Sequence, residues 1–117
     1  MWSREHRVAG RHFLDILAAS RAWHLPALSL RVARPQVTAT RRPAVPQFAL
    51  VVSRKVAIRA VDRNRLKRRG RAIVQELLPQ LKDNYACLLF FKKPATALTY
   101  QELKNTIREI FTRAAII

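Results

Sequence analysis

The sequence is poor in acidic residues. Only 7 Asp and Glu stand against 23 Lys and Arg in 117 residues, so the formal net charge at pH 7 is +16. A solvated surface without an anionic partner normally carries charges of both signs rather than an excess of one. Because such an excess repels itself in the compact state and attracts polyanions, we expect the partner to be a nucleic acid or an anionic membrane surface.

Glycine and cysteine are also scarce, and each absence excludes a kind of site. Two glycines leave no phosphate-binding loop and no glycine-rich dinucleotide turn. A single cysteine, Cys87, leaves no internal disulfide and favours a reducing, cytoplasmic location. The histidines, His6, His12 and His24, lack the spacing of metal ligands, and no paired carboxylates are evident. We therefore expect no catalytic residue, no metal site and no small-molecule substrate on the protein itself.

Long hydrophobic runs are absent as well. No stretch approaches the roughly 20 apolar residues that span a bilayer, and the first residues contain no apolar segment of a signal peptide. Half of the residues are nevertheless hydrophobic, which is enough for one modest core. We expect a single RNA-binding domain over residues 1–117, with no membrane partner.

Hydrophobic periodicity predicts three helices and at least three strands. The helices are expected over residues 10–20, over residues 61–78 and from Thr99 onward, where Thr99 and Glu102 have the spacing of a capping box. The strands are expected over residues 28–33, 48–53 and 85–91. Three prolines predict a long loop over Arg34–Gln47, and whether another strand precedes the second helix is left open. This order predicts an α+β sandwich with helices packed on a small sheet.

The expected helix over residues 61–78 has one apolar and one basic side. At 100° per residue, its core-facing stripe consists of Leu66, Gly70, Ile73, Val74 and Leu77. Opposite the stripe lie Asn64, Arg68 and Arg71, with Arg65 and Lys67 on the flanks and Arg63 and Arg69 nearer the stripe's edge. This helix and the turn before it concentrate the charge, because residues 54–71 contain nine basic residues and one acid, Asp62.

Like charges one helical turn apart occur within this basic side. Arg63 and Lys67 form one such pair, and Lys67 and Arg71 form another. Each pair costs a few tenths of a kcal/mol in an isolated helix, a repulsion that a bound polyanion relieves. Asn64 can hydrogen-bond a base edge or a 2′-hydroxyl, although an ordinary solvated Asn remains an alternative.

Several segments resemble the bacterial ribonuclease P protein component. The resemblance lies in Val52-Ser53-Arg54-Lys55, in Ala60-Val61-Asp62-Arg63-Asn64-Arg65-Leu66-Lys67-Arg68 with Arg71, and in Lys92-Lys93-Pro94-Ala95 followed by Leu98-Thr99-Tyr100-Gln101-Glu102-Leu103. Phe13 resembles the family's aromatic residue in the first helix. These segments occur in the family's order over nearly the whole chain.

The resemblance implies a fold and a function. The fold would be a two-layer α-β sandwich, a small mixed sheet with three helices in the order α-β-β-(β)-α-β-α, with a left-handed crossover into the last strand. The function would be that of the non-catalytic protein subunit of an endoribonuclease, a ribonucleoprotein that removes the 5′ leader of precursor tRNA. Its catalyst would be an RNA subunit, with magnesium held mainly by RNA, and the protein's partners would be that catalytic RNA and precursor tRNA.

The resemblance also assigns roles to residues. Those expected to bind the RNA subunit are Arg59, Arg63, Asn64, Arg65, Lys67, Arg68 and Arg71. Those expected to line a leader-binding cleft between the first helix and the sheet are Phe13, Arg31, Ser53, Arg54 and Lys55. Phe13 has two open roles, stacking on an unpaired base or packing in the core. Arg31, which alternates with Leu30 and Val32, is expected at an exposed strand position.

The chain departs from the family pattern at a few places. It has Val56-Ala57-Ile58 where many members carry glycine, and it has Gly70 in mid-helix, which we attribute to close packing of helix on sheet. Leu17 follows Phe13 by one turn, so the cleft is expected to lack a second aromatic residue. Two rival functions remain open: a small basic ribosomal protein, and a membrane-surface helix, which the use of the apolar stripe in the core disfavours.

Overall fold

The structure is a computed structural model that describes residues 4–34 and 45–117. The helices are α1 (Phe13–Ala19), α2 (Ala60–Leu77) and α3 (Tyr100–Arg113), and the strands are β1 (Arg21–His24), β2 (Leu28–Ala33), β3 (Gln47–Val51) and β4 (Ala86–Phe91). Short 3-10 segments occur at Arg4–His6, Gly10–His12, Leu78–Gln80 and Lys93–Ala97. The expected loop over Arg34–Gln47 lies mostly outside the described residues.

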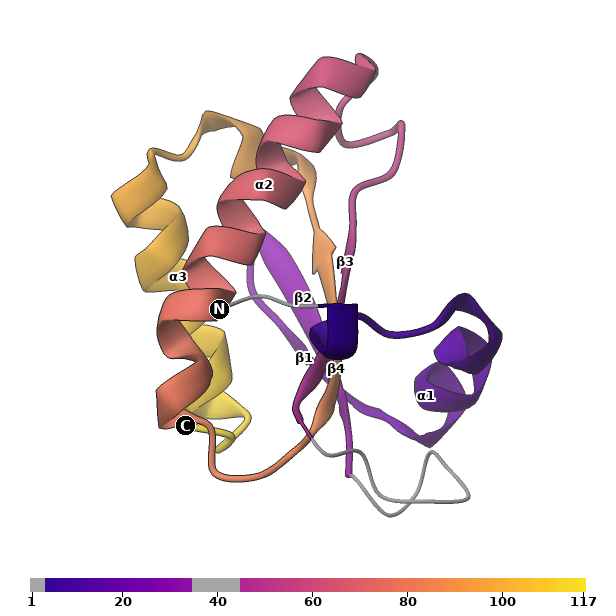
Figure 1. Cartoon of the computed structure of the whole chain (residues 1–117). Coiled ribbons are helices and arrows are strands. Elements are labelled where there is room, and N and C mark those ends of the chain that lie inside the picture. The colour runs from indigo at the N-terminus through magenta and orange to yellow at the C-terminus, as the bar shows by residue number, and fades with distance from the viewer. Residues whose placement is uncertain (1–3, 35–44) are drawn as a thin grey trace.

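The strands form one mixed sheet in the order β1-β2-β4-β3. Strands β1, β2 and β4 pair antiparallel, whereas β3 and β4 pair parallel and are joined through α2. Helices α2 and α3 cover one face of the sheet and α1 lies against the other (Figure 1). The predicted α+β class, with three helices on a small mixed sheet, is confirmed, and α1 adds a partial third layer. The left-handedness of the crossover stays a prediction.

Strand β1 is the additional strand that the sequence left open. Its four residues show no alternation, so no pattern located it. It forms a hairpin with β2, closed where the Leu25 N–H donates to the Leu28 carbonyl (2.8 Å). Two expected boundaries were wrong: β3 ends at Val51 rather than at Ser53, and α1 begins at Phe13 because Gly10–His12 forms a 3-10 turn.

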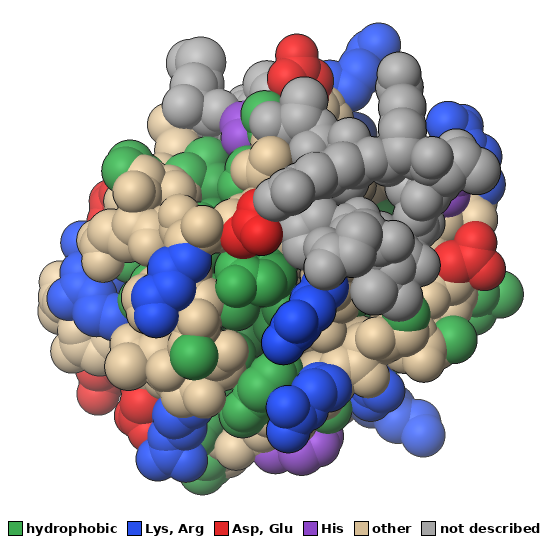
Figure 2. All heavy atoms as spheres, turned by 90° about the horizontal axis from the view of Figure 1, so that it is seen from below, with side chains coloured by type: hydrophobic (Ala, Val, Ile, Leu, Met, Phe, Trp, Pro, Cys, Tyr) green, Lys and Arg blue, Asp and Glu red, His purple; other side chains and the backbone are tan. Residues whose placement is uncertain are grey.

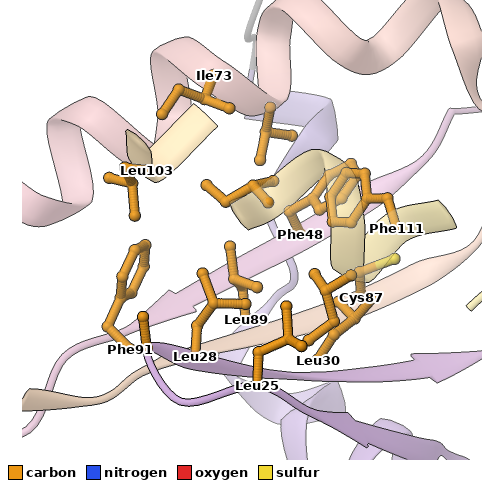
Figure 3. Close-up of a cluster of buried hydrophobic side chains, with 14 of the residues drawn as sticks. Leu25, Leu28, Leu30, Phe48, Ile73, Cys87, Leu89, Phe91, Leu103 and Phe111 are labelled. Atoms are coloured by element: carbon orange, nitrogen blue, oxygen red, sulfur yellow. The ribbon is translucent and has the colours of Figure 1, made fainter. Parts of the chain in front are cut away.

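The main core lies between the sheet and the pair α2 and α3 (Figure 3). Ile73 from α2 and Leu103 from α3 pack over Leu89 of β4, and the rings of Phe48 and Phe111 stack with centroids 6.1 Å apart. The apolar run of β4 serves both faces of the sheet, as expected for a buried central strand. Its odd-numbered residues enter this core, and its even-numbered residues meet α1.

Gly70 confirms that α2 packs closely on the sheet. A Cβ atom at this position would lie 2.8 Å from Cζ of the Phe91 ring and 3.4 Å from Cδ1 of Leu50. The first distance is shorter than van der Waals contact allows. The absence of a side chain therefore sets the approach of α2 to the strands on which it lies.

Helix α3 begins with the predicted capping box. The Thr99 hydroxyl accepts a hydrogen bond from the Glu102 N–H (3.2 Å), and the Thr99 N–H donates to the Glu102 carboxylate (2.9 Å). Two backbone donors that the helix itself leaves unpaired are satisfied in this way. In the part of the chain that the structure describes, no helix is long and apolar enough to cross a membrane.

Candidate nucleic-acid interface

Helix α2 turns Asn64 and Arg68 outward, as the spacing of 100° per residue predicted, but Arg71, which was expected with them opposite the stripe, is half-buried. All five residues of the expected stripe are buried. Asn64, Arg65 and Arg68 are exposed, whereas Lys67 and Arg71 are half-buried at the margin. The helix therefore presents a row of cations to solvent, anchored by a fully apolar inner side.

A basic hollow lies between α2 and the edge strand β3. It has a volume of about 390 Å³ and is lined by Arg7, Phe48, Ala49, Leu50, Asn64, Lys67 and Arg71. We call Arg7, Asn64, Lys67 and Arg71 the basic hollow residues. Because three of these four side chains are cationic and the fourth is an amide, the hollow is suited to a phosphate with an adjacent sugar or base.

Arg7 joins this hollow from the N-terminal segment. That segment lies beside β3 through a parallel bridge between Arg7 and Phe48, and the Val8 N–H donates to the Phe48 carbonyl (3.1 Å). The sequence-based assignment did not include Arg7. No local pattern relates it to α2, and only the path of the chain along β3 brings the two together.

A second hollow lies on the other side of α2, toward the beginning of α3. Its volume is about 650 Å³, and its lining includes Arg65 and Arg69 of α2 together with Asp62 and Tyr100. The residues predicted to bind the RNA subunit therefore lie on two sides of α2. Lys67 and Arg71 face the hollow beside β3, and Arg65 faces the hollow beside α3.

Two other basic residues contact the protein itself. Arg63 is half-buried, and its Nη1 donates to the carbonyls of Ala57 (2.9 Å) and Ile58 (2.6 Å) in the turn before α2. Arg59 lies 3.9 Å from the Asp62 carboxylate in an exposed pair, which contributes little to stability. Arg63 therefore holds the turn that leads into the helix, whatever else it binds.

Phe13 lies at the beginning of α1, on the face of the sheet opposite α2. Its half-buried ring packs edge-on against Phe90, with centroids 6.4 Å apart and an angle of 69° between the ring planes. Phe13 thus packs on the smaller core and still reaches the surface. Phe90 is a second aromatic residue here, so the expectation that this region lacks one was wrong. The unbroken apolar run of β4 hid the alternation that would have identified Phe90.

Arg31 points to the same face of the sheet as Phe13. It is half-buried rather than fully exposed, and its Nε donates to the Ser20 hydroxyl (2.8 Å), which in turn donates to the Leu17 carbonyl (2.8 Å). The C-terminal end of α1 therefore orients this guanidinium. We call Phe13, Arg31 and Phe90 the α1-side surface.

The remaining predicted leader residues lie elsewhere. Ser53, Arg54 and Lys55 are exposed in the turn after β3. In Figure 1 this turn is at the top of the molecule, away from α1. The structure thus divides the five predicted leader residues between two places, and places Ser53, Arg54 and Lys55 near the start of α2.

Positive charge extends beyond α2. Lys and Arg side chains are spread over the face shown in Figure 2 rather than gathered in one spot.

Within residues 4–34 and 45–117, no three His, Cys, Asp or Glu side chains lie close enough together to hold a metal ion. Burial raises the pKa of the Cys87 thiol well above its usual range, which keeps this residue unreactive at neutral pH.

Fold and surface together define a class: a small α+β protein that exposes a strongly basic helix beside the edge of a mixed sheet, an arrangement suited to RNA. A family model described as Ribonuclease P matches residues 3–115. The chain belongs to the ribonuclease P protein family.

Relatives and solved structures agree with this assignment. The chain is 31% identical over 94 residues to the ribonuclease P protein component of Microcystis aeruginosa, an alignment that covers 80% of this chain and 74% of that protein. It is 39% identical over 71 residues to the corresponding protein of a Pseudanabaena species, covering 61% of each. The Staphylococcus aureus RNase P protein has a similar fold, with a TM-score of 0.81 at 16% identity over 95% of this chain and 96% of that one. The Thermotoga maritima protein has a TM-score of 0.77 at 17% identity, over 92% of this chain and 96% of that one.

The family places the chain in tRNA processing, as an RNA-binding protein component of a ribonucleoprotein endoribonuclease. The resemblance inferred from the basic helix and its neighbours is confirmed. The alternative of a small ribosomal protein is not supported by these matches. At identities below 20%, the two solved structures establish the fold alone.

Proposed function

We propose that this chain is the non-catalytic protein subunit of ribonuclease P, and that it binds two RNAs on two surfaces. The outer side of α2, with the basic hollow residues, binds the catalytic RNA. The α1-side surface binds the 5′ leader of precursor tRNA. The observation that carries the proposal is the convergence of Arg7, Lys67 and Arg71 with Asn64 at the edge of β3.

The chemistry of the hollow favours an RNA backbone. A planar guanidinium can hold two phosphate oxygens at once, and two such groups flank the hollow together with one ammonium. The Asn64 amide supplies both a donor and an acceptor, which suits a 2′-hydroxyl or a base edge. Arg68, exposed on the same helix, extends the row of cations along the bound strand.

The α1-side surface has the features of a site for an unpaired strand. The half-buried Phe13 ring rests on Phe90, so a base that stacks on it meets a ring already held in place. Stacking of this kind contributes roughly 1–3 kcal/mol per base. Arg31, oriented through Ser20, places a cation on the same face for the leader's phosphates.

In this proposal the hydrolysis belongs to the catalytic RNA, which would hold most of the magnesium. The protein would supply positive charge beside the catalytic RNA and the leader, which lowers the repulsion between two polyanions and hence the magnesium needed to bring them together. The compartment would be the cytoplasm, and the free, buried Cys87 fits reducing conditions.

Reconstitution tests the proposal. Purified protein added to its catalytic RNA should restore removal of the 5′ leader at low magnesium. Arg68→Ala should weaken binding to that RNA and reduce the slope of log K against log salt by about one unit, because one phosphate contact is lost. Arg113→Ala is the matched control, since it removes an exposed cation that pairs with Glu109 on α3. Absence of stimulation by the wild-type protein would rule out the subunit role.

The leader surface is tested in the same system. Phe13→Ala should weaken binding of precursor tRNA and leave binding of mature tRNA unchanged. Leu14→Ala is the control, because this neighbouring side chain is 74% exposed. Equal losses for precursor and mature tRNA, or a lowered unfolding temperature that accounts for the loss, would assign Phe13 to the core alone.

A further inference from the structure

The turn before α2 and the first turn of the helix carry one exposed apolar side chain each. Ile58 is 87% exposed and Val61 is 60% exposed. Among the residues that the structure describes, Leu14 on α1 is the third large hydrophobic side chain with such exposure. Single exposed apolar residues are common on protein surfaces. Ile58 and Val61 are three positions apart at the start of the most basic helix, and we call these two side chains the apolar tip.

The backbone beneath the apolar tip is held by hydrogen bonds. Arg63 Nη1 donates to the carbonyls of Ala57 and Ile58, at 2.9 and 2.6 Å. On the other side of the turn, the N–H groups of Val56 and Ala57 both donate to the Ser53 carbonyl, at 3.1 and 3.2 Å. The Ala57 side chain is buried beside them. Ile58 is thus presented outward by a turn fixed on both sides, so binding at this position would cost little ordering entropy.

The apolar tip lies at one end of the molecule. In Figure 1 the turn and the first turn of α2 stand at the top, beyond the ends of the strands. Its exposed charged neighbours in the chain are three cations and one acid, namely Arg54, Lys55, Arg59 and Asp62, so the net charge there is positive. A partner that covers the tip must therefore tolerate this positive charge at close range.

These surroundings identify the kind of partner. A second copy of this chain would bring the same cations face to face, which is unfavourable for a protein of net charge +16. An RNA strand instead offers phosphates to the cations and an apolar base or ribose face to Ile58 and Val61. The charge around the tip is therefore complementary to RNA.

We propose that Ile58 and Val61 form an apolar contact with the catalytic RNA, packing against a base or ribose at the end of the surface where that RNA lies on α2. This inference rests on the proposed function, because it adds a contact to the same RNA interface. This apolar contact differs from the cationic contacts in how its contribution to affinity depends on salt. Burying an isoleucine releases no counterions, so its contribution to affinity does not depend on salt.

The salt dependence of binding tests the apolar tip. Affinity for the catalytic RNA is measured over a series of KCl concentrations for wild type, Ile58→Ala and the double variant Ile58→Ala/Val61→Ala. The double variant should bind roughly tenfold more weakly at every salt concentration, with an unchanged slope. Arg59→Ala should instead reduce the slope by about one unit. Leu14→Ala, which removes a side chain on α1 whose exposure (74%) lies between those of Val61 and Ile58, should bind as wild type does.

Each other outcome overturns the inference. Unchanged affinity of the double variant would show that the apolar tip does not contact RNA, and wild-type stimulation of leader removal would leave the proposed function intact. A changed slope would mean that the neighbouring cations had moved, so the affinity loss would not come from apolar contact. A change in the sedimentation of the free protein would assign the tip to self-association. Failure of the wild-type protein to bind the catalytic RNA would overturn the proposed function and the inference with it.

Discussion

Arg63 shows how a basic residue within a recognition pattern also serves the fold. Its guanidinium donates to the carbonyls of Ala57 and Ile58 and is half-buried. Its position in the helix, near the edge of the apolar stripe, anticipated this partial burial but not the hydrogen bonds. Asn64 and Arg68, which lie on the side of α2 opposite the apolar stripe, are exposed. Arg63 and Asn64 are adjacent in the sequence, yet the guanidinium of Arg63 is already bonded to the protein backbone, whereas the Asn64 side chain is exposed to a partner.

Gly70 is a position where helix propensity and packing oppose each other. Alanine in mid-helix is favoured over glycine by about 1 kcal/mol, but the added Cβ would lie 2.8 Å from the buried Phe91 ring. Overpacking of this kind costs about 1–3 kcal/mol. We expect Gly70→Ala to lower the free energy of unfolding by about 1 kcal/mol net, measured by urea unfolding as a lower midpoint at unchanged m.

Gly10→Ala provides the matched control. Apart from the local backbone and the adjacent residues, no heavy atom lies within 4 Å of a Cβ at this position, so the same substitution meets no obstacle there. Its midpoint should match that of the wild type. A stabilised Gly70→Ala variant would show that the Phe91 ring moves aside at little cost, and that the close approach of α2 is not set by this glycine.

At the scale of elements, α2 and α3 begin in different ways. Helix α3 has the reciprocal capping box of Thr99 and Glu102, whereas the N-cap residue of α2, Arg59, makes no side-chain capping bond. The turn before α2 is held by Arg63 instead. The capping box was readable from sequence because its two residues are three positions apart. The Arg63 contacts were not, because they depend on how the turn folds back on the helix.

The capping box should make the stability of α3 depend on pH. The hydrogen bond from the Thr99 N–H, followed by the bond with the Thr99 side chain, lowers the pKa of Glu102 from its ordinary value of 4.5. Because the folded-state pKa is the lower one, this stabilisation is present above pH 4.5 and is lost as the pH falls through the folded pKa. Glu102→Gln should therefore lose less stability than the wild type between neutral pH and about pH 3.

Thermal unfolding at both pH values measures this difference. Thr99→Ala should lower stability by about 1 kcal/mol at neutral pH, because it removes the side-chain acceptor of the cap. Glu76, whose pKa is lowered by its hydrogen bond with Lys104, is unchanged in both variants and adds the same acid dependence to each. Identical pH profiles for Glu102→Gln and wild type would contradict the assigned role of the carboxylate.

At the scale of the whole molecule, net charge opposes compactness. A charge of +16 on 117 residues is held together by a core on each face of a four-stranded sheet. The smaller core, under α1, consists of Val8, Ile16, Ala33, Ala86 and Leu88 with half-buried neighbours. A bound RNA would remove much of the repulsion, so binding and folding stability are coupled in this protein.

This coupling predicts that screening stabilises the free protein. Raising NaCl from about 20 mM to about 300 mM shortens the Debye length several-fold and should raise the unfolding midpoint. A gain of 1 kcal/mol corresponds to a shift of roughly 4 °C or more for a domain of this size. Calorimetry measures the shift. A midpoint that is constant or falls with salt would show that the charges are too far apart to repel each other appreciably.

By itself, the sequence determined the basic helix with its apolar stripe, strands β2 and β4, the capping box and the family. All of these depend on residue spacing within one segment, where helical or strand geometry decides which side chains share a face. The resemblance also named six site residues on α2, of which Asn64, Arg65 and Arg68 are exposed and the other three are half-buried.

Only the tertiary structure decided the composition of the surfaces. In the folded protein Arg7 lines one hollow with Lys67 and Arg71, and Phe13 packs against Phe90. Residues 53–55 lie away from α1 (Figure 1), and Ile58 is exposed to solvent. The first three depend on the path of one segment past another that is distant in the chain, whereas the exposure of Ile58 depends on how the turn folds back on the start of α2. No periodicity within a segment encodes such a path, since it results from how the sheet pairs and how both of its faces are covered.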